Sequence, residues 1–201
     1  MAGTDRCVGY TITRLGRRDW ADLVALLLCL DQRSCISRFG SATNDAALIA
    51  HASRAVVNAA WMGGAFIDAR LCGVAELYEF SLGDHKSAEV AFVVEPCWRR
   101  RGIATALLRA SAHWANSAGI STLRMVFSRS NWPMWKLARK GVTRLDLTLD
   151  ETICIEMCVS DGVERSEHAE PMPTRRQAVG ATESELFGTA WLQDSSADGA
   201  L

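Results

Sequence analysis

The chain has 201 residues, of which 49% are hydrophobic and 22% charged, and its formal net charge is −1 at pH 7. This length suits one domain with a substantial core, or one domain followed by a tail. Proteins that bind the phosphate backbone of nucleic acids carry a basic excess, which this chain lacks, so we expect no nucleic-acid partner and only a local anion site. The longest apolar stretch, Leu23 to Leu30, is too short to span a bilayer, so we expect no membrane association.

Cysteine usage favours a reducing environment. Seven cysteines are scattered along the chain without a CxxC pair, and no histidines cluster near them. This pattern predicts free thiols and no metal site. Met1 to Gly9 contains no continuous apolar stretch, so we expect no secretory signal and a cytoplasmic protein.

The first part of the chain contains both strand and helix patterns. Val8 to Leu15 is rich in β-formers, and Arg17 to Asp31 carries apolar residues at helical spacing. Ser34 to Asn44 is expected to be a loop. The next elements are predicted to be a helix over Asp45 to Ala60 capped by Asn44, a hairpin over Gly63 to Phe80, and a polar turn over Ser81 to Lys86.

The second part begins with a nearly unbroken apolar run. Glu89 to Val94 is typical of a strand covered on both faces, and Pro96 ends it. Gly102 to Ala118 has the clearest amphipathic helix pattern and is closed by Gly119. The remaining predicted elements are a strand over Thr122 to Phe127, a helix over Asn131 to Lys140, and a strand pair over Val142 to Leu149 and Glu151 to Val159.

This order of elements predicts an α/β sandwich: a central mixed β-sheet with helices on both faces, formed by residues 1–159. After Val159 the chain is rich in small and charged residues and includes Pro171 and Pro173, which predicts a disordered tail over residues 160–201. Thr182 and Glu185 have the spacing of a capping box, so a short docking helix within the tail is the alternative.

The segment from Val93 to Ala104 predicts an anion site. An apolar strand ends, three arginines follow, and a helix begins at Gly102. The first N–H groups of a helix have no intrahelical partner and carry partial positive charge, so phosphates bind there. Gly102 lets ligand oxygens approach the main chain closely. A solvated basic turn is the alternative, but the strand–turn–helix context favours phosphate binding.

Two motifs in this half resemble those of a known family. Arg99-x-x-Gly102-x-Ala104 resembles the pyrophosphate-binding signature of the GNAT superfamily of N-acetyltransferases. Asn131 to Gly141 resembles the later helix of that family, whose first Asn contacts the coenzyme. The resemblance extends from about Tyr10 to Val159. It implies metal-free, direct transfer of an acetyl group from acetyl-CoA to a primary amine of a small molecule or a protein.

The resemblance also implies where the coenzyme binds. It would lie between two splayed parallel strands, here Glu89 to Val94 and Thr122 to Phe127. The segment from Gln32 to Asp45, with Arg38 in it, would cover the acceptor, unless its charges are only solvated. The implied coenzyme contacts are Phe92, Val93 and Val94 in the first strand; Arg99, Arg100, Arg101, Gly102, Ile103, Ala104 and Thr105 around the pyrophosphate; and Asn131.

For the chemistry, Glu89 is the candidate general base, because it stands where histone acetyltransferases of this family carry theirs; Glu76 and Glu79 on the preceding strand are the rivals. Many family members protonate the leaving thiolate with a Tyr seven residues after the helix's first Asn. That position is Ala138 here, so the general acid is unassigned. Alternatives are a non-catalytic acyl-CoA sensor and an interaction protein whose tail recruits a partner. A homo-oligomer is compatible with the sequence.

Overall fold

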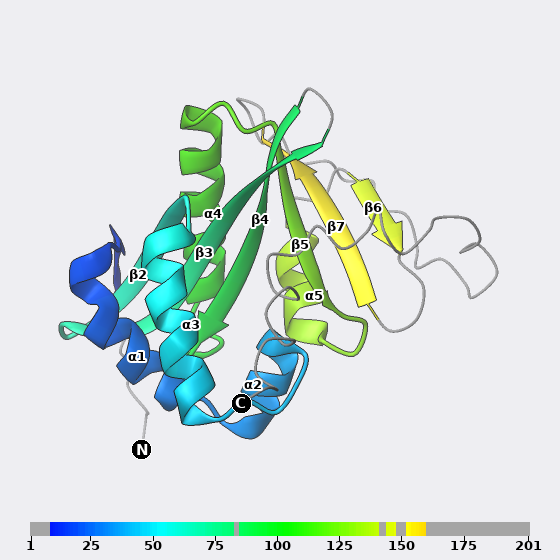
Figure 1. Ribbon diagram of the computed structural model, residues 1–201. Helices are drawn as coiled ribbons and strands as arrows, with labels where there is room; N and C mark the ends of the chain where they lie inside the picture. Colours follow the sequence, from blue (N-terminus) through cyan, green and yellow to red (C-terminus); the bar gives the residue numbers. More distant parts are fainter. Residues whose placement is uncertain (1–8, 83–84, 141–143, 148–151, 160–201) are drawn as a thin grey trace, which may run out of the picture. The chain divides into compact units, whose positions relative to one another are not determined.

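The computed structural model describes residues 9–82, 85–140, 144–147 and 152–159, and within them the predicted α/β sandwich is confirmed (Figure 1). Seven strands form one mixed sheet in the order β1-β2-β3-β4-β5-β7-β6. All neighbouring strands are antiparallel except β4 and β5, which are parallel. The strands are β1 (Thr11–Arg14), β2 (Trp61–Ile67), β3 (Arg70–Leu82), β4 (His85–Val94), β5 (Thr122–Ser128), β6 (Arg144–Leu147) and β7 (Thr152–Cys158).

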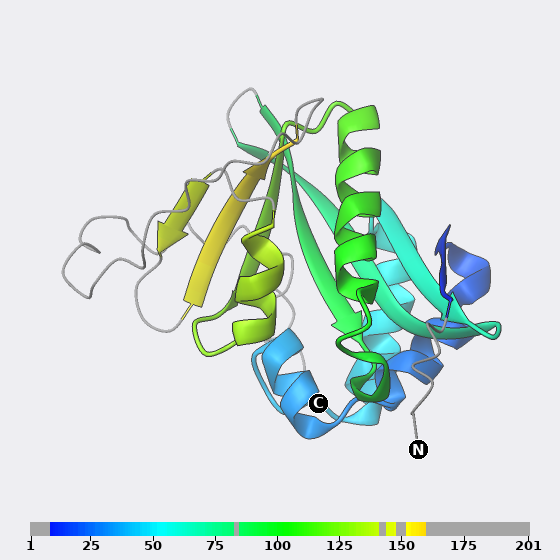
Figure 2. The same cartoon turned by 180° about the vertical axis from the view of Figure 1, so that it is seen from behind.

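Helices cover both faces of the sheet. The α-helices are α1 (Trp20–Leu28), α2 (Gln32–Phe39), α3 (Asp45–Asn58), α4 (Ile103–Ser117) and α5 (Trp132–Ala138), and two 3₁₀ turns are η1 (Arg17–Asp19) and η2 (Pro96–Trp98). Figures 1 and 2 show α1 and α3 over one face and α4 and α5 over the other, with α2 beside the ends of the strands where β4 and β5 diverge.

The sheet separates two hydrophobic clusters. On the α4 and α5 face, fully buried residues such as Leu77, Leu107 and Leu123 pack together. On the α1 and α3 face, Leu23 and Leu27 pack against the strands. Burying one large aliphatic side chain contributes roughly 1.5–3 kcal/mol. Successive side chains of a strand alternate between the two faces of the sheet, so each buried hydrophobic residue of β3, β4 and β5 belongs to one cluster or the other.

Helix α2 corrects the sequence analysis, which expected a loop over Ser34 to Asn44. The Asp31 carboxylate caps the helix by accepting from the N–H of Ser34 at 2.7 Å. Gly40 ends it in the left-handed conformation, with φ of 77°. Cys35 is buried beneath it. The helix is short and mostly polar, so it has no long apolar stripe by which periodicity would reveal it.

The other differences are in element boundaries. The helix expected over Arg17 to Asp31 is a 3₁₀ turn followed by α1, which ends at Leu28. The polar turn expected over Ser81 to Lys86 is narrower, because β3 continues to Leu82 and β4 begins at His85. The predicted cap of α3 is confirmed: Asn44 accepts from the N–H of Ala47 at 2.8 Å. The predicted tail from residue 160 and the stop at Gly141 lie outside the described residues.

Candidate functional site

The site is centred on a fork in the sheet. Strands β4 and β5 pair over only three positions, from Ser87 with Thr122 to Glu89 with Arg124. Beyond Glu89, β4 continues to Val94 and stays paired with β3, while β5 continues and stays paired with β7 (Figure 1). Among the described residues, β4 thus has no strand partner on its β5 side from Val90 onward. Backbone groups along this edge remain available to an extended ligand.

The open end of the fork leads to the N-terminus of α4. Gly102 is the N-cap residue and adopts a left-handed φ of 83°, and no side chain caps the helix there. A Cβ at this position would meet only the Tyr10 hydroxyl, at 3.5 Å. Arg100 also has a positive φ, of 67°. The turn therefore leaves an open approach to the first amides of a 15-residue helix, a favourable place for anions.

The three arginines of this turn have different surroundings. Arg99 folds back: its Nε donates to the Val94 carbonyl at 3.0 Å and its Nη2 donates to Ser34 Oγ at 2.7 Å. The Arg101 guanidinium lies over the Trp98 ring, 4.9 Å from its centre. All three arginines are exposed, and Arg99 braces the turn through its side chain.

The second arm of the fork contributes α5 and the residues after it. Asn131 caps α5 by accepting from the N–H of Met134 at 3.2 Å, and its Nδ2 donates to Ser37 Oγ at 2.7 Å. Lys140 follows α5 and donates from Nζ to Thr105 Oγ1 of α4 at 2.9 Å. A lysine from one arm is thereby placed beside the helix N-terminus of the other.

A buried charged cluster lies on the α2 and α3 face of β3. Glu76 is 0% exposed and its Oε2 accepts from Arg38 Nη2 at 2.9 Å and from the Tyr78 hydroxyl at 3.1 Å. His51 Nε2 lies 3.1 Å from the same oxygen. Burial alone would raise the pKa of Glu76, but the Arg38 guanidinium, followed by His51 and the Tyr78 hydroxyl, outweighs it and lowers the pKa to about 2. Glu76 is thus ionised at neutral pH.

A polar row crosses four strands on this same face. The register places Tyr78 of β3 opposite Glu89 of β4, Glu89 opposite Arg124 of β5, and Arg124 opposite Glu156 of β7. Arg124 forms an ion pair with Glu156, with 3.3 Å between Nη2 and Oε1, and its guanidinium lies 4.7 Å from the centre of the Phe80 ring. Glu89 is half-buried and stands at the apex of the fork.

The structure brings most of the sequence-predicted residues to the fork. Phe92, Val93 and Val94 lie in the part of β4 that has no pairing with β5, Arg99 to Thr105 form the turn and the start of α4, and Asn131 begins α5. Glu76 and Glu89 share one face of the sheet but have different surroundings. Ala138, at the position where the family resemblance implied a Tyr, is fully buried in the core.

Sequence reasoning missed the part of the site that α2 contributes. Ser34 and Ser37 contact Arg99 and Asn131, and neither serine stood out in a segment expected to be a loop. His51 and Lys140 were also missed. The spacing of Asp31 before Ser34, with Gly40 beyond, was the one local signal that could have indicated a capped helix.

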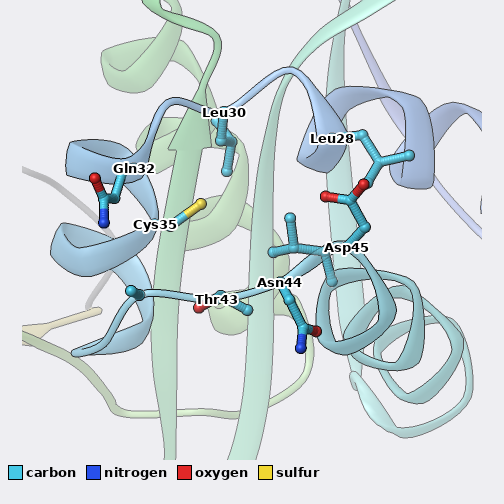
Figure 3. A pocket seen from close by; sticks show the side chains of 9 residues that line it. Leu28, Leu30, Gln32, Cys35, Thr43, Asn44 and Asp45 are labelled. Carbon is cyan, nitrogen blue, oxygen red and sulfur yellow. The ribbon is translucent and has the colours of Figure 1, made fainter.

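A pocket of about 460 Å³ lies away from the predicted coenzyme residues (Figure 3). It is bounded by the end of α1, by α2 and by the start of α3, and Figure 3 shows Leu30 and Cys35 pointing into it. Its lining consists of Leu28, Leu30, Gln32, Cys35, Ala42, Thr43, Asn44, Asp45 and Leu48. None of these nine residues is among the candidate catalytic or coenzyme residues, so the pocket lies outside the fork.

The described part of the chain has neither a cluster of metal-binding side chains nor a membrane-spanning helix. Its residues include no group of three or more His, Cys, Asp or Glu side chains placed to hold a metal ion. No helix within the described ranges is long and apolar enough to cross a membrane. The six cysteines in these ranges are free thiols.

The profile of the acetyltransferase (GNAT) family matches residues 27–142, more than half of the chain, so the chain belongs to this family. The match includes the fork, the turn and α5. A comparison with curated proteins gave no match.

Solved structures of acetyltransferases share the fold. The GNAT domain of S. lividans PAT is 22% identical, with a TM-score of 0.64 over 73% of this chain and 89% of that chain. The putative acetyltransferase yncA from Salmonella typhimurium, solved with acetyl-CoA, is 13% identical, with a TM-score of 0.57 over 79% and 99%. The paia N-acetyltransferase from Thermoplasma acidophilum, solved with coenzyme A, is 18% identical, with a TM-score of 0.56 over 75% and 99%.

Proposed function

We propose that this protein is an N-acetyltransferase that moves an acetyl group from acetyl-CoA directly to a primary amine. The observation that carries the proposal is the fork between β4 and β5, whose open edge leads to the uncapped N-terminus of α4. An extended chain with amide groups fits the edge, and phosphates fit the helix start. Acetyl-CoA has both parts in that order.

Each coenzyme part has a matching group in the chain. Backbone groups of Phe92, Val93 and Val94 would pair with the pantetheine amides and the acetyl carbonyl. The amides of the turn and of the first residues of α4, from Arg99 to Thr105, would bind the pyrophosphate, with the positive charges of Arg100 and Arg101 close by. Asn131 would contact the pantetheine arm from the second strand's side. The net charge of the chain is −1, so attraction for the phosphates must come from these local groups.

Glu89 is the preferred general base. The attacking amine must lose its proton, and Glu89 stands at the apex of the fork, next to the strand edge that would hold the thioester. Glu76 is on the same face, but it is fully buried and its pKa is lowered to about 2. A carboxylate so strongly stabilised in the ionised form is a poor proton acceptor, so we assign Glu76 a structural role.

The leaving thiolate must gain a proton, and no side chain of the described residues is assigned to that step. Ala138 cannot supply one. Tyr78 faces Glu89 across the strands, and burial, with the nearby Glu76 carboxylate, raises its pKa. The Tyr78 hydroxyl therefore keeps its proton at neutral pH and donates a hydrogen bond to Glu76. We infer that solvent protonates the thiolate.

A non-catalytic acyl-CoA sensor on the same fold is the second candidate, because a buried Ala138 occupies the general-acid position. Transfer assays separate the two functions. The protein is incubated with acetyl-CoA and a panel of small-molecule and peptide amines, in a cytoplasm-like reducing buffer, and N-acetylated products and free coenzyme thiol are measured together. Equal formation of both supports the transferase. Coenzyme binding without product from any amine would favour the sensor.

A further inference from the structure

Helix α2 presents one polar stripe to the fork. Ser34, Ser37 and Arg38 are spaced three and four residues apart, so they lie on one side of the helix. Cys35 lies on an adjacent side, buried in the cluster with α1 and α3. Ser37 is exposed, but each of the three side chains has a polar partner outside the helix.

These partners belong to both arms of the fork. Ser34 accepts from Arg99, which follows β4, and Ser37 accepts from Asn131, which follows β5. Over this stretch β4 and β5 have no hydrogen bonds to each other in the described residues. Helix α2 therefore connects two arms whose separation the sheet does not fix. Its contacts are with Arg99 and Asn131, the first residues of the two segments proposed to bind the coenzyme after β4 and β5.

The third contact ties α2 to the sheet. Arg38 is 10% exposed and pairs with the carboxylate of Glu76, which is held in turn by His51 of α3 and Tyr78 of β3. Removing one partner of a buried ion pair leaves the other charge without compensation and is strongly destabilising to the local arrangement. The cluster thus favours a single position of α2 on the sheet.

We propose that Glu76 is a positioning residue, which acts through Arg38 to hold α2 across the fork so that Ser34 and Ser37 fix the spacing of Arg99 and Asn131 for the coenzyme. The inference rests on the proposed function for its ligand. We call the chain of contacts from Glu76 through Arg38 to α2 the clamp. It is a property of the protein without ligand, so it can be measured separately from coenzyme binding.

Cys35 supplies that readout. It is 3% exposed beneath α2, and Cys72, which is 0% exposed on β3, serves as an internal reference for global opening. The full-length protein is labelled with iodoacetamide at one pH, and modification of the two thiols is followed by mass spectrometry with and without acetyl-CoA. The dissociation constant of acetyl-CoA is measured by calorimetry on the same samples.

Glu76→Gln keeps the side-chain volume and removes the charge. We expect the ratio of the Cys35 to the Cys72 labelling rate, which corrects for global opening, to rise at least tenfold over the wild type, and acetyl-CoA to bind about tenfold more weakly. Ser34→Ala/Ser37→Ala should weaken acetyl-CoA binding similarly while Cys35 stays protected. Ser53→Ala is the matched control and should change neither, because it removes only exposed hydrogen bonds of α3, one accepted from Trp20 and one donated to the Ile49 carbonyl, both at 3.0 Å.

If Glu76→Gln fails to fold, Arg38→Gln and Arg38→Lys are tested instead. We expect fast labelling of Cys35 in Arg38→Gln and restored protection of Cys35 in Arg38→Lys. An unchanged ratio of Cys35 to Cys72 labelling in Glu76→Gln or Arg38→Gln would overturn the clamp. Faster labelling with an unchanged dissociation constant would overturn the link to the coenzyme. If the wild type does not bind acetyl-CoA at all, the proposed function fails, and the labelling alone still decides the clamp.

Discussion

Glu89 of β4 stands opposite Arg124 of β5 at the last register position before the two strands separate. The pairing places a carboxylate at the apex of the fork, on the face that also carries Tyr78 and Glu156. Arg124 is directed to Glu156 and to the Phe80 ring. Under the proposed function, a base at this point would meet an amine that approaches a thioester held along β4.

The first prediction concerns Glu89. In Glu89→Gln the turnover number at neutral pH should fall by about a hundredfold or more, because the amine must then lose its proton to solvent. Raising the pH should restore much of the rate, since more amine is then unprotonated. The dissociation constant of acetyl-CoA should change little, because the coenzyme contacts are elsewhere.

The matched control for Glu89 is Glu79→Gln. Glu79 is an exposed carboxylate on β3, and it faces the opposite side of the sheet because it pairs with the buried Ala88. The Glu79→Gln variant should keep the pH–rate profile of the wild type. If Glu89→Gln also kept the wild-type profile, Glu89 would not be the base.

The second prediction concerns stability in acid. Because the pKa of Glu76 is lowered from 4.5 to about 2, its contribution to the free energy of unfolding is full above pH 4.5 and is lost as the pH falls through about 2. At about 1.4 kcal/mol per pKa unit, the contribution is about 3 kcal/mol. Urea unfolding of the wild type and Glu76→Gln between pH 2 and pH 5 measures it. The difference between the two proteins should shrink toward pH 2; parallel curves would contradict the assignment.

The third prediction concerns Lys140. Its Nζ lies 2.9 Å from Thr105 Oγ1, beside the start of α4, so it can reach a phosphate bound there. Lys140→Ala should weaken acetyl-CoA binding by roughly tenfold, the magnitude of one charge-assisted hydrogen bond, and should reduce the dependence of binding on salt.

Lys136→Ala is the control for Lys140, since Lys136 is an exposed lysine of α5 one turn earlier. It should bind acetyl-CoA as the wild type does. Equal losses in the two variants would mean that general positive charge, not the position of Lys140, attracts the coenzyme.

Much of the fold could be predicted because local signals agreed with the tertiary structure. The apolar run up to Val94, the arginines of the turn and the helix after Gly102 are contiguous, and their chemistry can be read without knowing the sheet order. The parallel pairing of β4 with β5 and the fork beyond Glu89 depend on contacts across more than thirty residues of sequence, and were reached through the family resemblance.

The remainder could not be predicted, because it depends on partners far apart in sequence. Glu76 reads as a possible base in the sequence, and only its contacts with Arg38 and His51 reveal a buried, fully paired carboxylate. Helix α2 has eight residues and little apolar periodicity, so its position is determined by Arg99, Asn131 and Glu76, not by its own sequence pattern. Tertiary contacts outweigh weak local preference in such a short helix.

The coenzyme site is the central claim, and Gly102 is the residue that tests it best. A glutamate at this position would put a side chain and a negative charge over the start of α4, where the pyrophosphate is expected. Gly119→Glu is a matched control: Gly119 also has a positive φ, of 73°, and a Cβ there would meet no atom within 4 Å. Both variants carry a similar backbone cost, of roughly 1–2 kcal/mol.

The measurement is isothermal titration of acetyl-CoA into the wild type, Gly102→Glu and Gly119→Glu, each checked for a cooperative thermal transition. We predict micromolar binding to the wild type and to Gly119→Glu, and no measurable binding to folded Gly102→Glu. Equal binding by all three proteins, or no binding by the wild type, would contradict the coenzyme site proposed at the fork.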